Sequence, residues 1–171
     1  MFEAFDASSS ALRAERLRMN LIANNLANVN TTRNQFNEKV PFRRRLAVLM
    51  PGNAEGADPK LGVTVQRIVQ DDAAPRLEWA PGHPDAIQFE DLFQTDANGK
   101  ITDKRRAGYE NIADDQWAKL VASQGQYVLL PNVDPDKEQI DLLMAARSYE
   151  ANVAVIENSK SIINQSLSII A

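Results

Sequence analysis

Cysteine is absent from this 171-residue chain, and histidine occurs once, as His83. Without thiols the protein cannot form disulfides, thiolate metal sites or a cysteine nucleophile. His83 lies in the turn sequence 81–84 with no second catalytic group beside it, so a surface turn residue explains it better than a hydrolase site. We therefore expect no enzymatic activity, no bound cofactor and no resident metal ion.

Long hydrophobic runs and an excess of positive charge are also missing. No apolar stretch approaches the roughly 18 residues that a membrane-spanning helix needs. The formal net charge is −4, which argues against nucleic acid or an anionic membrane surface as the main partner. The first six residues, MFEAFD, include acids and no basic side chain, so we expect no cleaved secretory signal.

Charge is missing from two particular stretches, residues 19–32 and 161–171, although 25% of the chain is charged. In a helix, Ile22, Leu26 and Val29 would share one face of the first stretch, with asparagines on the others. A face exposed to water would gain from Lys or Glu there, because Asn is a mediocre helix former. Buried carboxamides can bond to neighbours without the cost of burying a charge.

Two explanations remain for these uncharged ends. One is a fraying terminus with small polar residues. The other is a pair of helices packed among copies or relatives of the same chain. Because both termini share the pattern, we favour packing inside a polymer.

A seven-residue hydrophobic repeat marks the last segment as a long helix. The dipeptide at 134–135, Asp-Pro, is a helix start signal, and the pattern continues to about residue 170, a length of about 50 Å. Val155, Ile162 and Ile169 widen this stripe, and a matching repeat runs through residues 5–26. We therefore predict an α+β fold in which long N- and C-terminal helices pack as a coiled-coil-like hairpin. The repeat positions are Leu142, Tyr149, Ile156, Ile163 and Ile170.

The middle of the chain has strand signals instead. Residues 61–69 alternate and are rich in β-branched side chains, and residues 42–49 and 76–79 are weaker candidates. These segments predict a small β-rich central domain.

Residues 94–105 imitate an EF-hand calcium loop. Asp96, Asn98 and Gly99 fall at the expected positions, but Gln94 and Arg105 replace the first and last ligands. A calcium-responsive adaptor using this loop is the alternative function. The segment is either a degenerate helix–loop–helix, which the helical spacing of 113–122 favours, or a hairpin turning at Asn98-Gly99.

Two motifs carry a family resemblance. The stretch NNLANVNTT, residues 24–32, resembles the N-terminal signature of the flagellar rod and hook proteins. The stretches 125–134 and 146–153 resemble the C-terminal signature of proximal-rod members of that family, and residues 75–86 keep the family's order. Residues 87–124 interrupt that order as an insertion.

This resemblance completes the expected domain division. Residues 1–33 would be the N-terminal helix of the rod core, and 34–86 a β-rich outer domain. Residues 87–124 would be an EF-hand-like insertion of largely helical structure, and 125–171 a connecting strand with the long C-terminal helix.

The resemblance also implies a function. The chain would be a structural subunit of the flagellar proximal rod, polymerising through its terminal helices to transmit motor torque. Its partners would be copies of itself, the neighbouring rod proteins FlgB and FlgF, the rod adaptor FliE and the flagellar type III export apparatus. It would be exported without a cleaved signal into a rod that crosses the periplasm. The residues expected to interlock subunits are Leu26, Asn28, Tyr149, Asn152, Val153, Ile156 and Ile163.

Overall fold

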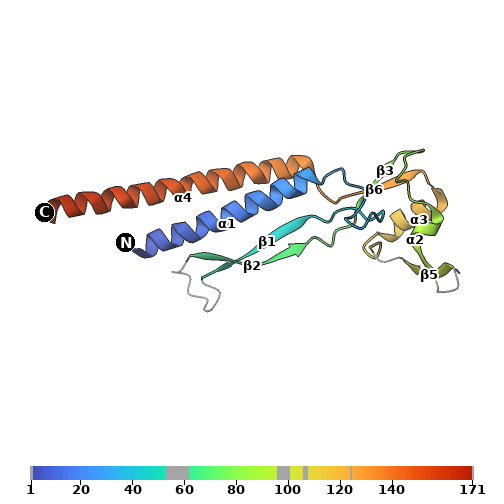
Figure 1. The fold of residues 1–171 in the computed structure, drawn as a ribbon, viewed down its shortest axis with the longest axis horizontal. Helices are drawn as coiled ribbons and strands as arrows, with labels where there is room; N and C mark the ends of the chain where they lie inside the picture. Colours follow the sequence, from blue (N-terminus) through green and yellow to red (C-terminus); the bar gives the residue numbers. More distant parts are fainter. Residues whose placement is uncertain (1, 53–61, 96–100, 106–107, 124, 171) are drawn as a thin grey trace. The chain divides into compact units, whose positions relative to one another are not determined.

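The computed structural model describes residues 2–52, 62–95, 101–105, 108–123 and 125–170 (Figure 1). The chain forms two compact units, each built from separate stretches of sequence. The first unit comprises Met1–Asn25, Arg45–Val69 and Pro135–Ala171, and the second comprises Leu26–Arg44 and Gln70–Asp134.

The first unit consists of two long helices and a β-hairpin. Helix α1 (Phe2–Ala27) runs beside α4 (Pro135–Ile170), and strands β1 (Arg45–Pro51) and β2 (Val63–Gln70) lie along the other side of α1 (Figure 1). The α+β fold with long terminal helices is confirmed, and so is the predicted C-terminal helix; the strand predicted at 61–69 is present as β2 from Val63 onward.

Two side-chain contacts fix the antiparallel register of α1 and α4. Ser148 Oγ donates to Glu15 Oε1 at 3.2 Å, and Asn25 Nδ2 donates to Glu138 Oε2 at 3.1 Å. The two contacts are ten residues apart on α1, at Glu15 and Asn25, and also ten residues apart on α4. Both contacts therefore belong to one register. In this register the start of α1 is level with residue 161, and residues 162–170 of α4 continue past it.

Helix α1 is shorter than the segment 1–33 expected from the sequence. It ends at Ala27, because the Thr31 N–H and hydroxyl both donate to the Asn28 carbonyl, at 3.1 Å and 2.8 Å, and close a turn. Competition of this kind between a side chain and the helical backbone is typical of Thr and Asn.

The second unit surrounds its own small hydrophobic core. Strand β3 (Arg76–Trp79) pairs antiparallel with β6 (Tyr127–Leu130), and β4 (Phe93–Thr95) pairs with β5 (Ile101–Arg105). Two helices, α2 (Phe89–Leu92) and α3 (Asp114–Ser123), complete it. The buried core consists of Ile87, Leu92, Tyr109, Ile112, Leu120 and Leu129.

The described ends of the EF-hand-like loop, residues 93–95 and 101–105, pair as strands β4 and β5, which agrees with the hairpin alternative for this loop rather than with a helix–loop–helix. Phe93 packs on Phe89 and edge-on to Trp117, with ring centroids 4.9 Å and 5.6 Å apart. An extended backbone points Phe93 at these rings while Gln94 turns outward and donates to the Arg105 carbonyl at 3.1 Å. Residues Asp96, Asn98 and Gly99 lie outside the described residues, and α3 confirms the helix predicted at 113–122.

The boundaries of the two units differ from those of the four segments expected from the sequence. The β1–β2 hairpin groups with the terminal helices, whereas residues 87–124 share a core with 34–44 and 70–86. Strand alternation identifies a strand, but it does not identify the element on which that strand packs.

Candidate assembly surface on the terminal helices

Asn25 is the buried polar centre of the first unit. Its side chain and that of Glu138 are both 0% exposed. Asn25 Oδ1 accepts a hydrogen bond from the Arg45 N–H at 2.9 Å, and Asn25 Nδ2 donates to the Arg45 carbonyl at 3.0 Å and to Glu138 Oε2 at 3.1 Å. One carboxamide from α1 therefore holds both β1 and α4.

The paired bonds to Arg45 resemble those that a neighbouring strand would make. In an antiparallel ladder one residue exchanges an N–H and a carbonyl bond with its partner, and the Asn25 carboxamide supplies the same donor and acceptor. Each buried polar group in this cluster has a hydrogen-bond partner, which is the condition under which buried polar networks stabilise a fold.

Five of the seven sequence-predicted contact residues share one side of α4. Ala145 and Glu138, both 0% exposed, mark the side of α4 that packs inside the unit. Spacings of 7, 11 and 18 residues return to nearly the same side of a helix and place four of the five residues on this half-buried side, with half-buried Val153 beside them, about 60° round the helix from Glu138. The five residues are Tyr149, Asn152, Val153, Ile156 and Ile163.

The other two predicted residues belong to the second unit. Leu26 lies in the last turn of α1, and Asn28 is in the turn that follows, where its carbonyl accepts from Thr31. Both side chains are half-buried. The structure therefore places five of the seven residues in the first unit and two in the second.

The opposite side of α4 carries a row of exposed apolar side chains. Their exposed fractions range from 45% to 59%. Only Val155 and Ile162 among them were expected from the sequence, because the seven-residue repeat marks the inner stripe. A step of 11 residues back from Val155 leads to Met144, four more back lead to Ile140, and three forward from Ile140 lead to Leu143. The row, called the outer face below, consists of Ile140, Leu143, Met144, Val155 and Ile162.

Comparison with known proteins shows the family to which this chain belongs. The profile of the family described as "Flagella basal body rod protein" matches residues 5–35, and that of "Flagellar basal body rod FlgEFG protein C-terminal" matches residues 124–169. The flagellar basal-body rod protein FlgC of Bacillus subtilis is 33% identical, with 98% of this chain and 97% of the relative aligned. The chain belongs to the FlgC family.

Further FlgC proteins align over almost the same extent. The FlgC proteins of Borreliella burgdorferi and Salmonella typhimurium are 30% and 29% identical, each over 99% of this chain and 97% of the relative. The resemblance to flagellar rod proteins is therefore confirmed over nearly the whole chain.

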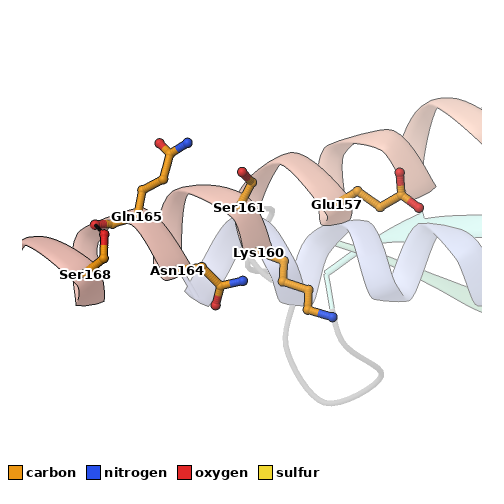
Figure 2. Close-up of a pocket in the computed structure, with 6 residues that line it drawn as sticks. All are labelled: Glu157, Lys160, Ser161, Asn164, Gln165 and Ser168. Atoms are coloured by element: carbon orange, nitrogen blue, oxygen red, sulfur yellow. Dashed lines mark hydrogen bonds between the residues drawn. The ribbon is translucent and has the colours of Figure 1, made fainter.

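The last turns of α4 in this FlgC-family chain present a polar face beside the apolar rows. Glu157 and Lys160 are followed by uncharged residues along a shallow surface depression of about 420 Å³ (Figure 2). Several hydroxyls bond to the helix itself: Ser159 to the Val155 carbonyl and Ser166 to the Ile162 carbonyl, both at 2.8 Å. A hydroxyl satisfied in this way can be covered by protein without losing a hydrogen bond. The uncharged residues are Ser161, Asn164, Gln165 and Ser168.

The second unit of the FlgC-family chain offers no comparable chemistry. His83 Nδ1 accepts from the Asp85 N–H at 3.0 Å, as expected of a turn residue. The Thr32 hydroxyl and the Arg33 guanidinium, each 2.6 Å from an Asp85 oxygen, hold the pKa of that carboxyl below its ordinary value. Across the described residues, no cluster of three or more His, Cys, Asp or Glu is placed to hold a metal ion, and no helix is long and apolar enough to cross a membrane.

Proposed function

We propose that this structural subunit of the flagellar basal-body rod builds the proximal part of the rod and polymerises through α1 and α4. The observation that carries the proposal is the outer face of α4. Helix α1 packs against one side of α4 inside the subunit. The opposite side of α4, the outer face, is apolar and exposed to solvent. Large exposed apolar rows of this kind are typical of protein–protein contacts.

Covering the outer face would supply the strength that a rod needs. Each fully buried Leu, Ile, Val or Met side chain contributes roughly 1.5–3 kcal/mol. With many such contacts between subunits, torque from the motor would be shared along the helices.

The seven residues predicted from the sequence have a related role in this proposal. Tyr149, Asn152, Val153 and Ile156 keep α4 fixed against the rest of its own unit, so force applied to the outer face passes through a rigid hairpin. Ile163 lies beyond the start of α1 and would also contact a neighbour. Leu26 and Asn28 remain proposed contacts at the other end of α1.

Membership of the FlgC family supports a proposal about the partners and the location. We propose that the subunit contacts copies of itself, FlgB, FlgF and FliE in a rod that crosses the periplasm. The flagellar type III apparatus would export it without a cleaved signal. Its role would be mechanical, with no catalytic step and no cofactor.

The calcium-responsive alternative has no support in the described part of residues 94–105. Arg105 stands where a calcium loop needs its bidentate Glu. Its guanidinium bonds to Asp114 Oδ1 at 2.6 Å and lies 4.5 Å from the Trp117 ring centroid. Arg105 therefore serves the packing of α3 on β5.

The direct experiment is to purify hook–basal bodies from the source cells and identify their proteins by mass spectrometry. We expect peptides of this chain in the rod fraction after extraction of the membrane, with hook protein as the control for intact particles. Intact hooks on basal bodies that lack this chain would contradict the proposal.

A further inference from the structure

Helix α1 and strand β2 of the first unit border a surface groove of about 460 Å³. Ser10 ties the two walls together at one end: its hydroxyl donates to the Ala7 carbonyl at 2.7 Å and accepts from the Val63 N–H at 3.0 Å. Gly62 has a φ of +89°, and a Cβ at this position would collide with Ser10 Oγ, so the close approach needs glycine. The groove is lined by Ser10, Arg13, Ala14, Leu17, Val63, Thr64 and Val65.

The end of α4 is a segment of suitable size that has no partner from α1. In the register set by Asn25–Glu138 and Glu15–Ser148, residues 162–170 extend past the start of α1. They span about 12 Å at 1.5 Å per residue, and the α1 wall of the groove, residues 10–17, spans about 10 Å. Ile162 and Leu167 in this tail are exposed.

A subunit cannot fill the groove with its own tail. The groove residues of α1 are level with the middle of α4, and α4 is one continuous helix to Ile170. The tail therefore leads away from the groove of its own chain. Only a second copy can place this segment there.

The charges of the two surfaces also match. The last turn of α4 has no basic residue, so the partial negative charge of its carbonyl end is not offset by its own side chains. Arg13 is exposed at the groove and has no ion pair with any residue that the structure describes. Its guanidinium can bond to the last carbonyls of a docked helix.

We propose that the tail of α4, residues 162–170, docks in the α1–β2 groove of a second copy of this chain. The contact rests on the proposed function, because it operates between assembling subunits. It joins different surfaces on the two copies, so it leaves a free groove and a free tail at the two ends of any open assembly. Contacts of this type build rings or helical filaments rather than two-fold symmetric dimers.

The absence of cysteine allows a clean cross-linking test with the full chain. Val65→Cys and Leu167→Cys chains, made separately, are mixed and oxidised mildly, and dimers linked through 65 and 167 are quantified by mass spectrometry. Ile68→Cys is the matched control, since it lies on the same strand, is exposed and is outside the groove. We expect Leu167→Cys to link at least about ten times more to Val65→Cys than to Ile68→Cys. Leu17→Cys, on the α1 wall of the groove, should link to Leu167→Cys as strongly as Val65→Cys does.

A second substitution tests the charge match. Arg13→Glu should lower the 65–167 linkage about two- to fivefold, the factor that corresponds to a helix-end charge interaction of 0.3–1 kcal/mol, and Arg13→Lys should preserve it. Circular dichroism confirms that each variant is folded. An unchanged yield with Arg13→Glu would count against the proposal.

Failure of this inference can be told apart from failure of the proposed function. Equal linkage to Val65→Cys and Ile68→Cys, in samples that associate in sedimentation experiments, would overturn the docking site and leave polymerisation intact. Chains that stay monomeric at every concentration would contradict both.

Discussion

Replacing Asn25 with leucine is expected to lower the free energy of unfolding of the first unit by about 3–5 kcal/mol. The substitution removes three hydrogen bonds and leaves the part-buried Arg45 N–H and carbonyl and the buried Glu138 carboxylate without this partner. Leaving a buried polar group unsatisfied costs about 1–3 kcal/mol, and more for a charged one. Glu138→Gln should cost less, because a carboxamide oxygen can still accept from Asn25.

The two units can be followed separately during urea unfolding. The two tryptophans, Trp79 and Trp117, both lie in the second unit, whereas the long helices α1 and α4 dominate the circular dichroism signal. Asn25→Leu should therefore shift the dichroism transition much more than the fluorescence transition. The control is Asn20→Leu, the same change at an exposed position of α1. If both substitutions had the same small effect, Asn25 would not hold the hairpin together.

Placing charge on the outer face of α4 is expected to abolish assembly while the subunit stays folded. Leu143 and Val155 are 54% and 45% exposed, so Leu143→Asp with Val155→Asp costs the isolated chain little. In an assembled rod the two side chains would be covered, and two lost apolar contacts plus two buried carboxylates should weaken association at least about a hundredfold. Sedimentation velocity and swimming of cells that carry the variant measure the effect.

The matched control is Leu49→Asp, which adds a charge at an exposed apolar position of β1. It should associate like the unchanged chain. Normal assembly and motility of the Leu143/Val155 double variant would show that the outer face is not a contact between subunits.

Elements with strong local signals could be predicted closely from the sequence. Asp134-Pro135 sets the start of α4, and a sustained hydrophobic repeat carries the helix to residue 170. Strand β3 begins and ends where expected, at 76 and 79, between turn residues. In each case residues within a few positions of one another decide the structure.

What depends on distant partners could not be predicted. Asn25 becomes a buried hub only because Arg45 and Glu138, 20 and 113 residues away, surround its carboxamide. Glu138 falls in the first turn of α4, where an acidic residue has a purely local explanation in the helix dipole. The one signal was the missing charge in residues 19–32, and of the asparagines in that stretch only Asn25 is buried within the chain.

The segment around residues 93–105 shows a different limit. Its spacing fitted both a calcium-loop remnant and a hairpin, and helical spacing in α3 favoured the wrong one. The decision comes from Phe93, whose ring contacts Phe89 and Trp117 from a strand. Such packing is a tertiary effect that overrides the local pattern.

Hydrogen exchange of the α4 tail tests most directly whether neighbouring subunits complete the packing of this segment. Amides of residues 157–170 would be compared in the dilute monomer and in assembled rods, with strand β6 (Tyr127–Leu130) of the second unit, where Val128 and Leu129 are buried, as an internal reference. We predict that the tail exchanges rapidly in the monomer and at least about a hundredfold more slowly in the rod, while the reference segment changes little. Equal and strong protection of the tail in both states would contradict the account.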